Sequence, residues 1–168
     1  MHLVRKSLYG FEFAKIGTFH ITDEPHPVIY DGLSDHIQVE MRLISEKFTN
    51  ADESVYLIYV NDVLYYVGEY SYNLKERWGL RKGKYIWHHK DVEIEKELRK
   101  NNNVNIWIIV DPYVCTGDSS KINISKSIEQ EILKRKMPIW NTRGQLEKWA
   151  SWRQKHCKKV VDIIQELS

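Results

Sequence analysis

The sequence has little of what marks several large classes of protein. Its 168 residues include only two cysteines, Cys115 and Cys157, far apart and without C-x-x-C spacing. That scarcity argues against a disulfide-stapled scaffold and a thiolate zinc site. No apolar run approaches the ~18 residues of a membrane-spanning helix, and the first residues, MHLVRKSLYG, lack the apolar centre of a signal peptide. We therefore expect a soluble, cytoplasmic protein without a membrane segment.

Internal repeats, low-complexity tracts and a strong charge excess are missing as well. The chain is 42% hydrophobic and 29% charged, with a net charge of +2, which is ordinary composition for a globular protein. The length fits a single domain over residues 1–168, and 6 Trp, 10 Tyr and 4 Phe are ample for a core. This charge neither requires nor excludes a nucleic-acid partner, because binding needs only a local basic patch.

Basic residues are in fact concentrated locally. A solvated helix face and a nucleic-acid contact surface both fit such clusters. The clusters comprise Lys75, Arg77, Arg81, Lys82 and Lys84 with Trp78 and Tyr85 between them, then Lys134, Arg135 and Lys136, and finally Arg153, Lys155, Lys158 and Lys159.

Hydrophobic periodicity predicts the first half of the fold. Residues 1–30 contain short alternating stretches broken by glycine and proline, typical of strand fragments and loops. Ile37, Met41, Ile44 and Phe48 recur at the spacing of one helix face. They predict an amphipathic helix from about Ser34, within an N-terminal extension over residues 1–53.

The remaining pattern predicts an α/β protein. Residues 55–68 are β-branched and aromatic around Asn61-Asp62, which indicates a β-hairpin. The elements expected after it are a helix over 73–78, a helix over 92–100 capped by Asp91, a buried strand over 104–110, a polar loop over 113–124, a helix over 126–137 and a C-terminal helix within 142–168. We expect a small, mainly antiparallel sheet with a central hairpin, flanked by helices and carrying N- and C-terminal extensions.

The most specific pattern begins at this hairpin. It reads Ser54-Val55-Tyr56, then nine residues, then Tyr66-Val67-Gly68, with Arg77 on the next predicted helix. Farther along, the order continues with Glu129, Ile132-Leu133-Lys134-Arg135, Pro138 and Asn141. This ordered set, over residues 54–141, resembles the GIY-YIG nuclease superfamily, whose hairpin carries one tyrosine on each strand. A compact chain of this kind is most similar to its stand-alone type II restriction endonucleases.

The resemblance implies a metal-dependent endonuclease that hydrolyses phosphodiester bonds of double-stranded DNA, of the sequence-specific restriction type. It implies Mg²⁺ or Mn²⁺ held by Glu129, and a homodimer or higher homo-oligomer. A repair or mobile-element nuclease and a non-catalytic nucleic-acid-binding module are the alternatives. The implied catalytic residues are Tyr56, Tyr66, Arg77, Glu129 and Asn141.

The chain departs from the superfamily pattern at three places. Ser54 stands where glycine is usual, and one extra residue separates Gly68 from Arg77. Arg81 occupies the position, four residues after the arginine, that often holds histidine or tyrosine. Candidates to replace that group are Tyr85, His88 and His89.

The two tyrosines make a geometric demand on the hairpin. A three- or five-residue loop centred on Asn61 would place Tyr56 opposite Tyr66, on one face of the ladder. A two-residue turn would place Tyr56 opposite Val67, on the other face from Tyr66. The chemistry requires the longer loop, with Tyr59 and Tyr65 on the opposite face and Leu64 on the tyrosine side.

A helical wheel separates the two acids of the helix over 126–137. Glu129 falls within the apolar stripe of Ile128, Ile132 and Leu133, whereas Glu131 falls outside it. A carboxylate on an inward face must be paired, protonated or bound to a cation. A divalent metal and a salt bridge both meet that requirement.

The implied roles follow from side-chain chemistry. Arg77 would clamp the scissile phosphate. Tyr56 would take a proton from the attacking water, and Tyr66 would position that water or form a hydrogen bond to Tyr56; the reversed assignment of the two tyrosines is the alternative. A phenol has a reference pKa of about 10, so we expect nearby cations to favour the phenolate. Asn141 would brace the site by hydrogen bonds, and the expected DNA contacts are Lys75, Arg81, Lys82, Lys84 and Arg153.

Overall fold

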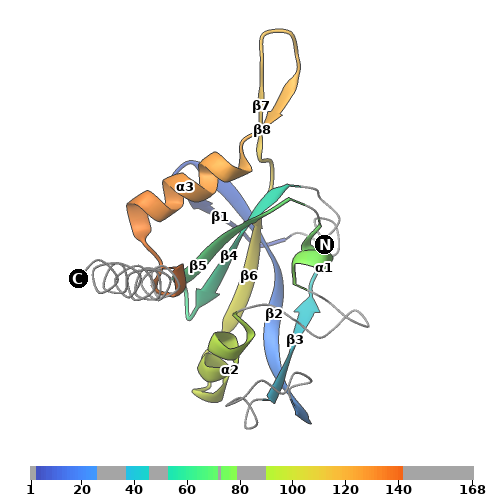
Figure 1. Cartoon of the computed structure of the whole chain (residues 1–168), viewed down its shortest axis with the longest axis vertical. Coiled ribbons are helices and arrows are strands. Elements are labelled where there is room, and N and C mark those ends of the chain that lie inside the picture. The colour runs from blue at the N-terminus through green and yellow to red at the C-terminus, as the bar shows by residue number, and fades with distance from the viewer. Residues whose placement is uncertain (1–2, 26–36, 46–52, 72, 79–89, 142–168) are drawn as a thin grey trace, which may run out of the picture.

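The computed structural model describes residues 3–25, 37–45, 53–71, 73–78 and 90–141 (Figure 1). The strands of the main sheet are β1 (Arg5–Leu8), β2 (Phe11–Pro25), β3 (Ile37–Leu43), β4 (Ser54–Val60), β5 (Val63–Tyr70) and β6 (Val104–Ile109). The other elements are α1 (Leu74–Arg77), α2 (Asp91–Arg99), the short strands β7 (Tyr113–Cys115) and β8 (Lys121–Asn123), and α3 (Ser125–Lys136).

The six-stranded sheet follows the order β1-β2-β6-β4-β5, with β3 pairing with β2. Every pairing among these strands is antiparallel, and β4 with β5 forms the hairpin expected from the sequence. The α/β class with a mainly antiparallel sheet flanked by helices is therefore confirmed. Among the described strands β5 lies at an edge of the sheet, which leaves alternate backbone groups of that strand available to other partners.

Alternation along the strands gives the sheet two buried faces. The first, which we call the tyrosine face, carries Tyr56, Ile58 and Tyr66. It is covered by Trp78, which directly follows α1, and by Ile94 of α2. The second, which we call the α3 face, is built on Val55, Leu57 and Val67 and is covered by Ile128 and Ile132 of α3. Figure 1 shows α3 packed across β4 and β5, away from α1 and α2. None of the helices in the described ranges has the length and hydrophobicity needed to cross a bilayer.

The helix predicted from about Ser34 is wrong where the structure describes the chain. Ile37 and Met41 lie in strand β3, which pairs with the far half of the unusually long β2. The N–H of Ile37 donates to the buried Glu95 carboxylate of α2, which fixes the start of the strand. The open edge of a 15-residue neighbouring strand thus outweighs the helical spacing of four apolar residues. Phe48 lies outside the described residues.

The other predicted elements are close to the observed ones. The helices over 73–78, 92–100 and 126–137 and the strand over 104–110 correspond to α1, α2, α3 and β6. Asp91 opens α2 as its first helical residue, while Lys90 occupies the cap position. The loop over 113–124 is instead a two-stranded ribbon, β7–β8. The predicted C-terminal helix lies outside the described residues.

Candidate active site

The hairpin turn has two residues, so the predicted three- or five-residue loop is wrong. Asn61 and Asp62 have φ values of 45° and 66°, and Val60 pairs with Val63. Positive φ at both central positions is the pattern of the tight type I′ turn. The Asn61 side chain also binds the loop after α2, where its oxygen accepts the N–H of Asn103 at 2.9 Å.

A β-bulge at Tyr65 brings the two tyrosines to one face despite the short turn. Tyr59 pairs with Leu64 but Ile58 pairs with Tyr66, which leaves Tyr65 as the extra residue of β5. One extra residue reverses the alternation for the rest of the strand. The tyrosine pair is therefore obtained by a route that the turn residues alone do not indicate.

The bulge also reassigns the neighbouring side chains. Tyr59 lies on the α3 face, as predicted, with its ring 5.9 Å from that of Trp107. Tyr65 is not opposite to the pair: it packs against the tyrosine-face core, edge-on to Trp140 at 5.2 Å. Leu64, expected beside the tyrosines, belongs to the α3 face.

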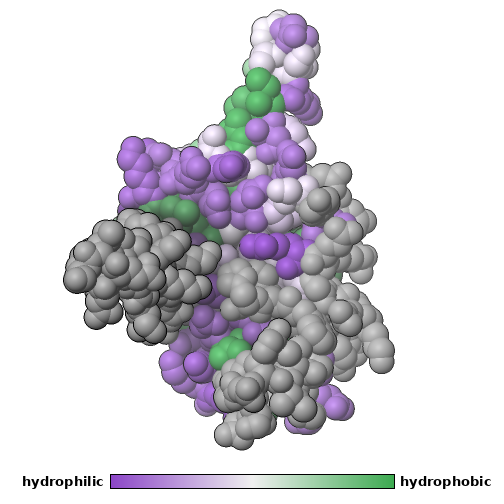
Figure 2. Space-filling model, in the orientation of Figure 1, coloured by the Kyte–Doolittle hydropathy of each residue, from purple (hydrophilic) through white to green (hydrophobic). Residues whose placement is uncertain are grey.

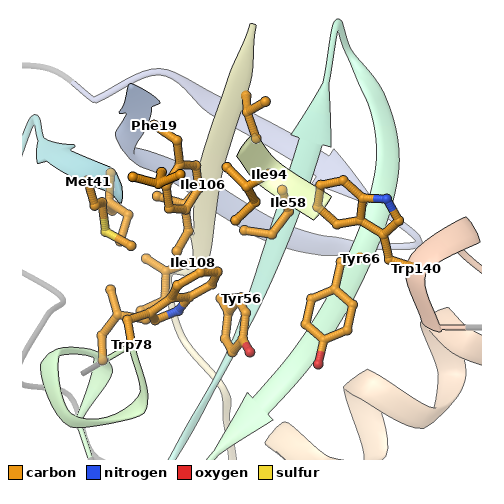
Figure 3. Packing of buried hydrophobic residues seen from close by; sticks show 14 of the residues in the cluster. Phe19, Met41, Tyr56, Ile58, Tyr66, Trp78, Ile94, Ile106, Ile108 and Trp140 are labelled. Atoms are coloured by element: carbon orange, nitrogen blue, oxygen red, sulfur yellow. The ribbon is translucent and has the colours of Figure 1, made fainter. Parts of the chain in front are cut away.

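Tyr56 and Tyr66 project side by side from β4 and β5, with their hydroxyls on the same side (Figure 3). Their ring centroids are 5.9 Å apart, and Trp78 packs edge-on against Tyr56 at 5.3 Å. Gly68 pairs with Tyr56 across the ladder. A Cβ at Gly68 would lie 2.5 Å from the Tyr56 hydroxyl oxygen, so the glycine makes room for the ring. Ser54, where glycine is usual, is buried opposite Tyr70.

Arg77 connects the exposed surface to this buried pair. It ends α1, and its guanidinium hydrogen-bonds to both phenols while the side chain stays exposed. Burial lowers the pKa of Arg77, but the two phenol oxygens outweigh that effect and raise it. The guanidinium is thus a fixed positive charge between the tyrosines and solvent.

The two phenols differ in how readily they lose a proton. Burial and the neighbouring Tyr66 raise the pKa of Tyr56 well above its ordinary value, and Tyr56 donates its hydroxyl proton to Tyr66. Burial also raises the pKa of Tyr66, but the hydrogen bond from Tyr56 and the charge of Arg77 work in the opposite direction. Tyr66 is therefore the more easily ionised of the two.

Glu129 reaches this group from α3. Its Oε1 accepts the N–H of Glu69, a residue of β5, at 3.2 Å. Burial and the Glu69 carboxylate raise the pKa of Glu129, and Arg77 and Lys126 lower it. Among the described residues no ion pair engages Glu129, whereas Glu131 forms one with Arg135. The helical wheel predicts an inward position for Glu129, and in the structure its side chain is half-buried.

Asn141 binds the free edge of β5. Its side-chain oxygen accepts the N–H of Val67 at 3.0 Å, and its side-chain nitrogen donates to the carbonyl of Val67 at 2.8 Å. The amide thus pairs with the edge as a neighbouring strand would. Glu129 accepts the next outward-pointing N–H of the same strand, that of Glu69. Asn141 and Glu129, the last and an earlier residue of the motif, therefore both bind the strand that carries Tyr66.

Two residues near the tyrosines escaped the sequence reasoning. Glu69 directly follows Tyr66-Val67-Gly68 and lies close enough to Glu129 to affect its pKa. Lys90 is 6% exposed, with its ammonium 5.7 Å from the centre of the Tyr66 ring. The only sequence signal for Glu69 was its place directly after the Tyr66-Val67-Gly68 motif. No spacing in the sequence indicated Lys90.

A divalent cation fits the donor chemistry here. Carboxylate oxygen is the ligand type that Mg²⁺ and Mn²⁺ prefer, and Mg²⁺ is commonly held by one or two carboxylates. The hydrogen bond from Glu69 uses one carboxylate oxygen of Glu129, and a carboxylate can accept at both. No group of three or more His, Cys, Asp or Glu suited to a metal exists in the described ranges. Such an ion would be bound mainly by the Glu129 carboxylate, with Glu69 as a neighbouring acid.

Several predicted residues cannot be placed. For Lys75 the structure describes only the backbone, within α1. The others fall outside the described residues: Arg81, Lys82, Lys84 and Arg153 among the expected DNA contacts, and Tyr85, His88 and His89 among the candidates for the missing group.

Comparison with known proteins finds a distant structural likeness. No family model and no curated protein sequence matches the chain. Its structure is similar to that of a point mutant of bacteriophage T4 EndoII, at 18% sequence identity and a TM-score of 0.48, over 77% of this chain and 91% of that one. A likeness this distant is not evidence of shared chemistry, which has to be argued from the residues themselves.

Proposed function

We propose that this protein is a metal-dependent endonuclease that hydrolyses phosphodiester bonds in double-stranded DNA. The observation that carries the proposal is the meeting of Tyr56, Tyr66, Arg77 and Glu129 at one end of the sheet. These residues come from two strands and two helices, and the charge of Arg77 lowers the pKa of each of the other three. An exposed guanidinium, a pair of phenols and a half-buried carboxylate form the kind of set that phosphodiester hydrolysis requires.

The surroundings of each side chain indicate its role in the proposed reaction. Arg77 would bind a phosphate oxygen and stabilise the charge that develops on it. Tyr66, the more easily ionised phenol, would act as a phenolate stabilised by the hydrogen bond from Tyr56, and would take the proton of the attacking water to become a neutral phenol. A divalent cation on Glu129 would supply Lewis-acid polarisation of the phosphate and a water molecule of lowered pKa.

We further propose a sequence-specific enzyme of the restriction type, which assembles as a homodimer or larger homo-oligomer to cut both strands. The motif order and its resemblance to stand-alone members of the superfamily support this choice. A repair or mobile-element nuclease would share the chemistry but leave nicks or dispersed cuts. A non-catalytic binding module would share only the affinity for DNA.

Cleavage of unmethylated phage DNA in Mg²⁺ or Mn²⁺ tests the proposal. The variants are Glu129→Gln and Arg77→Ala, and the matched control is Glu131→Gln, which removes the carboxylate two positions from Glu129 that pairs with Arg135. We expect discrete fragments from the wild type and the control, and none from the other two. Metal-dependent nicking or a smear would refute the restriction type alone. Salt-sensitive DNA binding without any cutting would refute the enzyme and favour the binding module.

A further inference from the structure

The β7–β8 ribbon projects from the body of the protein beyond the end of the sheet (Figure 1). Val114 pairs with Ile122 and Cys115 with Lys121, and the turn between the strands contains Gly117. Within the described parts of the chain, the two strands pair only with each other. Three residues of strand at ~3.3 Å each, with the turn added, reach more than about 10 Å from the body.

The base of the ribbon is fixed to the elements that carry the candidate catalytic residues. The side chains of Asn123 and Ser125 both donate to the carbonyl of Glu53, at 2.8 Å and 2.9 Å. Glu53 immediately precedes β4, which carries Tyr56, and Ser125 begins α3, which carries Glu129 one turn later. The ribbon is therefore held in a defined position beside the active-site end of the sheet.

The ribbon exposes apolar side chains on both of its strands. Val114 is 44% exposed and its cross-strand partner Ile122 is 51% exposed. Tyr113, at the base, is 41% exposed. Figure 2 shows an apolar patch along the ribbon between more polar surfaces of the body and the tip. Toward the tip the side chains are small and polar, with Ser119 and Ser120 exposed and one basic residue, Lys121, on the way back. The tip also carries one acid, Asp118, whose carboxylate accepts hydrogen bonds from the Thr116 hydroxyl and the Ser120 N–H within the turn.

We propose that this ribbon enters a groove of the DNA duplex whose backbone lies on Arg77 and Glu129, and that its side chains select the sequence to be cut. The inference rests on the proposed endonuclease function. A two-stranded ribbon fits the major groove, which is about 12 Å wide and 8.5 Å deep. A duplex bound beside the ribbon base brings a groove within the reach of its tip.

The side chains of the ribbon match base edges better than phosphates. Apolar groups such as those of Val114 and Ile122 contact the methyl group of thymine, and hydroxyls such as that of Ser119 bind either base of a pair. The ribbon strands carry a single basic residue, Lys121, whereas phosphate contacts are made largely by Lys and Arg.

A second copy of the chain is the other occupant to consider. Stable protein–protein interfaces bury about 1,200–2,000 Å², which three exposed apolar side chains on a narrow ribbon do not supply by themselves. The position beside the candidate active site is a further reason to favour DNA, because the proposed reaction requires the DNA backbone to lie there.

The first test removes the apolar surface and keeps the ribbon. Val114→Thr with Ile122→Thr retains β-branched side chains, and the matched control is Val63→Thr, an equally exposed valine (53%) at the far end of the β4–β5 hairpin. We expect unchanged melting for both proteins. For the double variant we expect the dissociation constant for duplex DNA to rise about tenfold and the fragment pattern to change. The control should match the wild type in both measurements.

Cys115 supplies a second, direct measurement. It is exposed on β7, so its alkylation by iodoacetamide, followed by peptide mass spectrometry, reports whether DNA covers the ribbon. We expect duplex DNA to protect Cys115 at least severalfold in Glu129→Gln protein, which binds without cutting.

The outcomes of these tests distinguish a failure of the ribbon inference from a failure of the proposed endonuclease function. If the wild type cuts DNA, and the double variant matches it in affinity and fragments while Cys115 stays reactive, the ribbon inference is overturned and the endonuclease stands. If no metal supports cutting but DNA protects Cys115, the endonuclease is overturned and the ribbon stands as a DNA contact. A loss of oligomeric mass in the double variant, with DNA affinity unchanged, would show that the ribbon binds a second copy and would overturn the inference.

Discussion

Substitution of Gly68 by alanine tests whether the backbone of β5 holds Tyr56 in place. An alanine Cβ would lie 2.5 Å from the hydroxyl oxygen and 2.6 Å from Cζ of Tyr56, and 2.9 Å from Cε1 of Tyr66. The Tyr56 ring is fully buried, with Trp78 against its side at 5.3 Å, so it has no open space to enter. Either the ring or the strand has to shift, and in both cases the paired hydroxyls separate.

The expected loss of stability combines two opposing effects. Overpacking of a filled core costs typically about 1–3 kcal/mol. Replacing glycine in a strand recovers about 0.5–1 kcal/mol of conformational free energy. The free energy of unfolding of Gly68→Ala should therefore fall by about 1–2 kcal/mol, which corresponds to about 2–8 °C in melting temperature for a chain of this size.

A double-mutant cycle with Tyr56→Leu isolates the clash. Leucine lacks the ring atoms that approach Gly68, so in that background only the 2.9 Å contact with Cε1 of Tyr66 remains and Gly68→Ala should cost less free energy of unfolding than in the wild type. Urea denaturation of the four proteins measures this difference directly. If Gly68→Ala stabilises the protein equally in both backgrounds, Tyr56 does not pack tightly over Gly68. The inference that this position needs glycine to make room for the ring would then be refuted.

Other substitutions probe protonation and the strand edge. Because the pKa of Glu129 is raised, its ionisation destabilises the metal-free fold as the pH rises from below the ordinary value of 4.5. Glu129→Gln should therefore melt above the wild type at neutral pH, with the difference vanishing in acid; equal melting throughout would contradict the shift. With Tyr66 as base and its pKa raised, the cleavage rate should climb with pH from about 7 to about 9.5 without a plateau. Tyr66→Phe should abolish that slope while Tyr56→Phe keeps it at a lower rate, and the opposite result would reverse the two roles. Asn141→Asp loses its donor to β5 and should reduce the free energy of unfolding by about 1–3 kcal/mol, with cleavage lowered as well; unchanged urea denaturation would show that the strand edge does not need it.

The sequence predicted those parts of the fold whose signals are local. The turn residues at Asn61-Asp62, the apolar stripe of α3 and the run of β6 each act within a few residues. The strand β3 was missed because the contacts that stabilise it come from residues far away in the sequence. They are the open edge of β2 and the buried carboxylate of Glu95. The ribbon was missed for a related reason, since polar turn residues between two three-residue strands have the same composition as a loop.

The candidate site shows the same division between local and distant causes. Motif order was enough to nominate Tyr56, Tyr66, Arg77 and Glu129, which the structure brings together. The way they come together depends on the bulge at Tyr65, which no spacing rule signals. Relative acidity of the two phenols also depends on burial and on the direction of one hydrogen bond, neither of which is written in the order of residues.

The location of the site at an edge strand explains why its residues lie so far apart in the chain. Among the described strands, β5 has outward N–H and carbonyl groups without a sheet partner, and these belong to Val67 and Glu69. Asn141 and Glu129 bind them, and in doing so both side chains are set against the strand that carries Tyr66. Closing the edge by a neighbouring strand would satisfy the backbone equally well, but it would leave no carboxylate beside the tyrosines. The open edge of β5 is therefore what allows one helix to deliver Glu129 to the phenols and the guanidinium, and the same helix fixes the base of the ribbon next to them.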